Sequence, residues 1–179
     1  MKRILISLVT LAVATTINAQ VWIGGSLSFN NTHVNGTEGT SRTFGISPEV
    51  GVNLNEHLAV AVALAFSHSN PSSGYNTNTY AVGPYVRYSF FKAGDFSAFV
   101  DGGVSYANSH YQHHDKNGNA FGASIIPGIA YAVSEKVGLV AHLGNGLYWN
   151  HSWVKDGNHT NNYGFDLTNG ISFGAYYNF

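Results

Sequence analysis

Apolar residues recur at every second position along most of this chain, and this spacing constrains its fold more than any other feature. The run from Leu58 to Phe66 is the clearest, because larger apolar residues alternate there with four alanines. A period of two is typical of a β-strand, whereas a helix would repeat every 3.6 residues. Eight such runs lie at 21–29, 44–54, 58–66, 80–90, 96–106, 121–133, 139–149 and 165–179. The sequence therefore predicts an all-β protein with eight strands.

The connections between these strands alternate in length. Three are short polar turns, at 55–56, 92–95 and 134–136, and four are longer segments rich in Asn, Gly, Ser, Thr and His, at 31–42, 68–78, 108–119 and 150–162. Transmembrane barrels show this asymmetry, with short periplasmic turns and longer outer loops. We therefore expect an eight-stranded antiparallel up-and-down transmembrane β-barrel with both ends of the mature chain on the periplasmic side.

The composition of the second strand face decides which side meets lipid. Charged residues are 9% of the chain, against roughly 25% in a typical soluble domain. The positions between the apolar residues carry mainly Gly, Ala and Ser, which suit a narrow interior better than a hydrated exterior. The net charge of −1 gives no basic surface for nucleic acid, and the lack of cysteine excludes disulfides, thiolate metal sites and a lipidated cysteine. We expect the apolar face to contact outer-membrane lipid.

The first nineteen residues have the order of a secretory signal. Met1, Lys2 and Arg3 precede an apolar run that ends near the small residue Ala19. This run is shorter than the roughly 20 residues that a spanning helix needs. We expect residues 1–19 to be a cleaved signal peptide and residues 20–179 to be the outer-membrane barrel domain, with an uncleaved anchor as the alternative.

Aromatic residues mark the end of each strand that faces a long connection. On the apolar face, one aromatic stands there in all eight strands: Phe29, Phe44, Phe66, Tyr80, Tyr106, Phe121, Trp149 and Phe165. Such a girdle is typical of a membrane interface. The alternative is that these residues are ordinary strand formers, which would be scattered along the strands.

The final strand, from Asn169 to Phe179, carries a family resemblance together with the signal peptide and the alternating connections. The whole mature chain resembles the OmpA-type β-barrel domain of bacteria with two membranes. This resemblance implies that Tyr177 and Phe179 form the signal read by the barrel-assembly machinery. Larger relatives continue into a peptidoglycan-binding domain; here we expect the barrel only, as a monomer.

Four ionisable residues fall on the interior face at similar depth: Glu49, Arg87, Asp101 and His142. Arg87 and Asp101 lie opposite each other across the hairpin centred on Gly94. We expect an ionic layer that plugs the lumen, with Arg87 between two carboxylates and His142 as a further partner. A gate is the alternative, but eight strands enclose little more than the volume of their own side chains.

The remaining candidates for chemistry are weaker. Seven of the nine histidines lie in the long connections, including His110, His113, His114, His151 and His159. Imidazole can bind zinc or copper, but this spacing matches no closed zinc site, and we expect no metal and no cofactor. His68-Ser69 and His151-Ser152 are the pairs that a lipid-modifying enzyme could use.

The sequence favours a non-enzymatic outer-membrane barrel whose role is mainly structural, or one of surface interaction with a ligand through its four long loops. A narrow porin-like channel for ions or small solutes is the second reading. A lipid-modifying enzyme of the outer membrane is the third.

Overall fold

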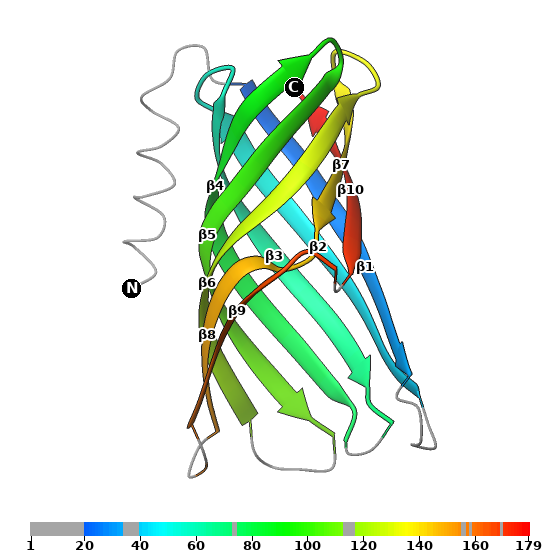
Figure 1. The fold of residues 1–179 in the computed structure, drawn as a ribbon, viewed down its shortest axis with the longest axis vertical. Coiled ribbons are helices and arrows are strands. Elements are labelled where there is room, and N and C mark those ends of the chain that lie inside the picture. The colour runs from blue at the N-terminus through cyan, green and yellow to red at the C-terminus, as the bar shows by residue number, and fades with distance from the viewer. Residues whose placement is uncertain are drawn as a thin grey trace.

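The structure, a computed structural model, describes residues 20–33, 40–72, 75–112, 117–154, 157, 159–168 and 170–179. They form an antiparallel sheet rolled into a barrel (Figure 1). The predicted signal peptide lies outside the described residues. The strands are β1 (Gln20–His33), β2 (Thr40–Asn53), β3 (Leu58–Asn70), β4 (Thr77–Ala93), β5 (Phe96–Tyr111), β6 (Asn117–Ala132), β7 (Val137–Leu143), β8 (Gly146–Val154), β9 (His159–Asp166) and β10 (Ile171–Asn178).

These ten segments make eight barrel strands, as the sequence predicted. The seventh strand is interrupted between β7 and β8, and the eighth between β9 and β10. The sheet closes where β1 pairs with β10, from Trp22 opposite Asn178 to Ser28 opposite Ser172. Among the described residues, no helix is long and apolar enough to cross a bilayer.

The predicted turns and long connections differ in how well they match the structure. The short turns lie where expected, between β2 and β3, β4 and β5, and β6 and β7. The long connections are shorter than predicted, because polar residues at both ends continue the strands. Thr43 bonds Ser69 at 3.0 Å and Thr79 bonds Ser109 at 2.8 Å across neighbouring strands. Such polar ladders extend a sheet without any apolar alternation.

The two faces of the sheet separate as the alternation predicted. Large apolar side chains on the outward phase of every strand are exposed, among them Ile23, Leu64, Tyr80 and Phe173. The interior of the half toward the short turns holds a different set, with Trp22, Phe99 and Val140 buried. The apolar surface therefore faces away from the lumen, as a membrane barrel requires.

Pro48, Pro84 and Pro127 lie within strands β2, β4 and β6. The first two interrupt hydrogen bonding without shifting the register of the strands. At Pro48 and Pro84 the pairing with one neighbour lapses and then resumes in the same register, because proline lacks the donor that the ladder needs. Pro127 differs. It lies between Ile125, which faces Leu147, and Gly128, which faces His142, so β6 advances three residues while its partner advances five. This is a bulge of two residues in the seventh strand.

Candidate functional site

A buried ion pair lies in the middle of the lumen. Arg87 on β4 and Asp101 on β5 are direct cross-strand partners. The Nε and Nη2 atoms of Arg87 each donate to one carboxylate oxygen of Asp101, both at 2.8 Å. The two residues are only 9% and 7% exposed. This two-point geometry fixes both side chains across the lumen more firmly than a single contact would.

His142 on β7 joins the pair from across β6, which pairs with both β5 and β7. Its Nε2 atom lies 2.8 Å from Asp101 Oδ2, and its Nδ1 atom lies 3.4 Å from the Ser172 hydroxyl. Both contacts are satisfied by the tautomer in which Nε2–H donates to Asp101 and Nδ1 accepts from Ser172. In this tautomer the 3.4 Å approach of Arg87 Nη2 to His142 Nε2 is a contact and not a hydrogen bond.

Glu49 does not flank Arg87 as the sequence analysis expected. Its Oε2 atom accepts a 2.6 Å hydrogen bond from the Tyr85 hydroxyl, and among the described residues no cation forms an ion pair with it. Tyr85 lies two residues before Arg87 on the same face of β4, so it fills the position between the two charges. Arg87 therefore pairs with one carboxylate instead of two.

Aromatic rings surround the guanidinium, and the sequence analysis missed them. The Cζ atom of Arg87 lies 4.0 Å from the ring centroid of Phe99, which is 0% exposed. The rings of Tyr85 and Trp22 lie 5.7 and 5.8 Å from the same carbon. Phe99 also contacts His142 edge to face at 5.4 Å. We call Arg87, Asp101, His142 and Phe99 the lumen layer.

Glycines on neighbouring strands make room for these rings. A Cβ atom on Gly51 would collide with the ring of Trp22, and one on Gly128 would collide with the ring of Phe99. Gly138 likewise faces the Tyr176 ring. The small residues of the interior face are therefore partners of specific large ones, and together they narrow the lumen on the turn side of Asp101.

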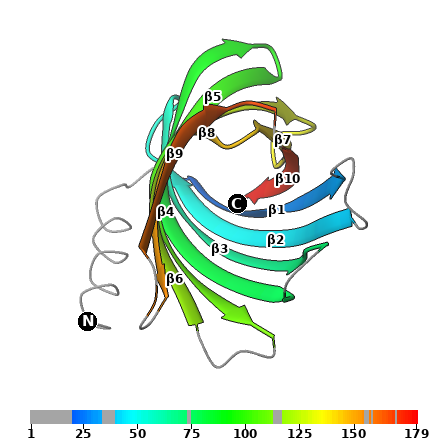
Figure 2. The same ribbon diagram turned by 60° about the horizontal axis from the view of Figure 1, so that its bottom comes forward.

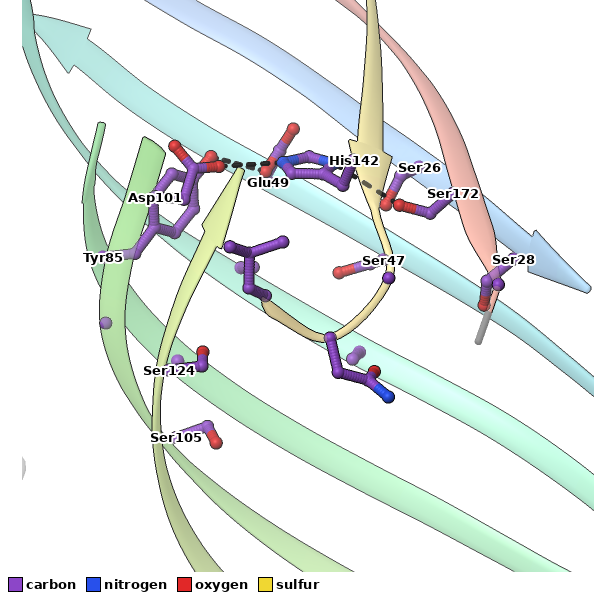
Figure 3. A pocket seen from close by; sticks show the side chains of 18 of the residues that line it. Ser26, Ser28, Ser47, Glu49, Tyr85, Asp101, Ser105, Ser124, His142 and Ser172 are labelled. Atoms are coloured by element: carbon purple, nitrogen blue, oxygen red, sulfur yellow. Dashed lines mark hydrogen bonds and ion pairs between the residues drawn. The ribbon is translucent and has the colours of Figure 1, made fainter. Parts of the chain in front are cut away.

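The lumen layer separates two cavities. The cavity toward the loop ends has a volume of about 560 Å³, and Asp101, His142 and Glu49 line its end toward the short turns, at the top of Figure 3. The cavity toward the short turns has a volume of about 450 Å³ and is lined by Arg87, Phe99 and Trp22 among others. No residue lines both cavities.

The connected side chains of Ser172, His142 and Asp101 invite comparison with a serine hydrolase. The Ser172 hydroxyl is 3.4 Å from His142 Nδ1, just beyond the roughly 2.6–3.2 Å of a nucleophile and its base, a range that apo sites often exceed. Both oxygens of Asp101 are also bonded to Arg87, which already balances the charge that a hydrolase would use to support its histidine. The arrangement fits a fixed polar network better than a catalytic triad.

The predicted loop histidines are largely strand residues. His68, His110 and His151 each lie within 2.7–2.8 Å of an Asn Oδ1 atom directly opposite on the neighbouring strand: Asn78, Asn117 and Asn161. His113 and His114 lie outside the described residues. Among those that the structure does describe, no three His, Cys, Asp or Glu residues group as metal ligands. The pairs His68-Ser69 and His151-Ser152 belong to the same strand ladders.

The family model for the outer membrane protein beta-barrel domain matches residues 4–179. The chain belongs to this family. It is a small outer-membrane β-barrel protein. No curated protein matches it in sequence.

Solved structures agree with this outer-membrane barrel fold. Neisserial surface protein A superposes with a TM-score of 0.59 at 16% identity, covering 90% of this chain and 99% of that one. A major outer membrane protein from Thermus thermophilus gives 0.51 at 14% identity, covering 90% and 100%. The N-terminal barrel domain of Pseudomonas aeruginosa OprF gives 0.48 at 15%, covering 89% and 97%. At such identities the first two matches show the fold alone.

In this outer-membrane barrel the eight predicted girdle residues lie on the outward phase of their strands, and all except Phe66 are exposed by more than a third. Phe66 packs against Tyr80, with the ring centroids 5.2 Å apart. At the other end, the rings of Tyr177 and Phe179 meet edge to face at 5.2 Å. Their roles as interface girdle and as assembly signal stay predictions.

Proposed function

We propose that this outer-membrane barrel has a structural and surface-interaction role, with a lumen that the lumen layer seals. The observation that carries this proposal is the buried, two-point Arg87–Asp101 ion pair, which stands between two separate cavities. Eight strands enclose a space that side chains alone can fill, and around Arg87 large rings fill it.

The energetics of the layer also support a seal. A solute crossing the lumen would have to displace Arg87 from Asp101 and from the face of Phe99. Breaking a buried pair by removing one partner costs about 3–5 kcal/mol. A conducting pore would need a continuous polar path. Here the charged groups of Arg87 and Asp101 are hydrogen-bonded to each other across the lumen.

The surface part of the proposal rests on the ends of the strands. Polar residues continue the sheet at the loop ends of β3–β4, β5–β6 and β8–β9, where paired His and Asn side chains link each hairpin. These hairpins form rigid supports for the connecting loops, and binding residues are commonly carried on loops that a rigid scaffold positions. A ligand on the cell surface, or a neighbouring protein, would meet this end first.

A narrow channel is the second candidate, because the two cavities flank a single layer. Conductance of purified protein in planar bilayers distinguishes the two functions. The sealed barrel predicts no current steps for the wild type, and steps for Arg87→Ala if that truncation joins the cavities. Regular steps for the wild type would overturn the seal and support a channel.

A further inference from the structure

The wall of the barrel is unsealed on one side near the loops. Ser28 and Ser172 are the last partners between β1 and β10. Beyond them, the described part of β1 pairs only with β2, and β9 pairs only with β8. In Figures 1 and 2 β1 and β9 diverge toward the loop end. We call this opening between β1 and β9 the side opening.

Specific backbone turns create the side opening. Gly144, Gly146 and Gly170 have φ values of 60°, 63° and 103°, a region that other residues rarely adopt. Between the pairs Leu143–Ile171 and Gly146–Asp166, the eighth strand advances five residues while the seventh advances three. The Asp166 carboxylate accepts a 2.8 Å hydrogen bond from the Thr168 backbone N–H, which forms a local turn. These turns direct β8 and β9 away from β1.

The cavity on the loop side of the lumen layer reaches the side opening. Its lining includes Phe29 and Asn30 on β1, and Gly170 and Ile171 before and at the start of β10. These positions come directly after the last β1–β10 pair. A volume of about 560 Å³ lies within the roughly 300–1,000 Å³ of small-molecule sites.

The outside of the side opening faces the membrane. Phe29 is 62% exposed, Phe165 69%, Phe173 64% and Tyr163 77%, and they are among the most exposed large residues of the chain. Unpaired backbone groups are tolerated at membrane depth only where they line a polar or water-filled cavity. Phe29 and Phe165 belong to the predicted interface girdle, so the opening lies where the bilayer meets the outer aqueous phase, with the serine-lined cavity, which we call the chamber, on its inner side.

The chamber selects for a particular head group. Six serines line it, Ser26, Ser28, Ser47, Ser105, Ser124 and Ser172. Asp101 is balanced by Arg87, which faces the other cavity, while Glu49 has a hydroxyl partner and, among the described residues, no ion-pair partner. A carboxylate without a cation disfavours an anionic head group and favours an amine.

We propose that this cavity binds a single-chain amphiphile whose amine-bearing head group carries no net negative charge. The head enters the serine-lined chamber beside Glu49, and the acyl chain leaves through the side opening into the outer leaflet. A second copy pairing along β1 would leave the chamber empty, so the lipid is the better occupant. In this inference the lumen layer closes the chamber on the side of the short turns, so the inference rests on the proposed seal.

Native mass spectrometry of the purified barrel tests this proposal. The probes are lysophosphatidylethanolamine, which carries an amine and no net charge, and lysophosphatidylglycerol of the same chain length, which is anionic. Ser124→Phe fills the chamber, and Ala123→Phe adds the same ring on the outward phase as the matched control. Heat-dependent migration on gels checks that each variant is folded.

We expect one tightly held lysophosphatidylethanolamine in the wild type and in Ala123→Phe, with affinity reduced about tenfold or more in Ser124→Phe. The wild type should prefer the amine lipid by about fivefold, and Glu49→Gln should remove that preference without filling the chamber. Equal binding by Ser124→Phe, or no head-group preference, would overturn the proposal, as would lipid-free dimers. Failure of the seal would show separately, as conductance of the lipid-free wild type.

Discussion

Arg87 lies over the ring of Phe99, with its guanidinium carbon 4.0 Å from the ring centroid. The guanidinium lies over the ring while its Nε and Nη2 atoms donate to Asp101. Arginine can satisfy both partners at once because its charge is planar and delocalised, whereas lysine presents a point charge. The polar and apolar parts of the lumen are therefore held by the same side chain.

Removing the arginine should destabilise the barrel strongly. Arg87→Ala leaves Asp101 buried without its cation, and we expect a loss of about 3–5 kcal/mol in the free energy of unfolding. The double variant Arg87→Leu/Asp101→Leu should recover most of this loss, because no charge is then left unpaired. Urea unfolding in lipid vesicles measures both. If Arg87→Ala were as stable as the wild type, the ion pair would not contribute to the stability of the barrel.

The fit between Phe99 and Gly128 should be sensitive to one methyl group. Gly128→Ala places a Cβ against the Phe99 ring and the backbone of Ala141, and overpacking of this kind costs about 1–3 kcal/mol. Gly102→Ala is the matched control, because a Cβ there meets nothing within 4 Å. Equal stability of the two variants in urea unfolding would contradict the packing described here.

The hydroxyl of Tyr85 should stabilise the barrel through Glu49. Tyr85→Phe removes the 2.6 Å donor to that carboxylate, and a lost hydrogen bond to a charged group is worth about 1.5–3 kcal/mol. In a Glu49→Gln background the same substitution should cost less, because the acceptor is no longer charged. A double-mutant cycle of unfolding free energies checks this coupling. Additive effects would mean that the two groups act independently.

Cysteine pairs should locate the end of the closed seam. Ser28→Cys/Ser172→Cys joins direct partners of an antiparallel ladder, whose spacing allows a disulfide. Asn31→Cys/Tyr163→Cys spans the side opening, and we expect no bond there. The chain has no other cysteine, so a change in gel mobility without reductant is unambiguous. Efficient cross-linking of the second pair would show that β1 and β9 come together.

The sequence predicted the faces of the strands because inward and outward positions alternate strictly with a period of two. It also placed Arg87 opposite Asp101 by centring the hairpin on Gly94, and the structure reaches that register through a bulge between Ser89 and Phe91. The rings of Trp22, Phe99 and Tyr176 were missed, because the glycines that accommodate them lie on neighbouring strands and leave no linear pattern.

The breaks in the seventh and eighth strands were missed for another reason. Each inserts two residues, and an even insertion keeps the alternation in phase. Leu139 and Leu147 therefore share one pattern on both sides of the break, although β7 and β8 pair in different registers with β6. The alternation of apolar residues predicts the sheet face on which a residue lies. It does not show whether the hydrogen-bonded ladder continues past that residue.

Thiol labelling of single-cysteine variants tests the seal most directly. Ser124→Cys lies in the cavity on the loop side of the lumen layer and Ser97→Cys in the cavity on the turn side. The barrel is placed in vesicles and a membrane-impermeant reagent is added outside. The labelled fraction of Ser124→Cys should equal that of Gln112→Cys, which lies near a loop on the same side of the lumen layer. The labelled fraction of Ser97→Cys should equal that of Glu56→Cys, which lies in a turn on the other side. Adding Arg87→Ala should make both lumen cysteines reactive from either side. Reaction of both from one side in the intact barrel would contradict a sealed lumen.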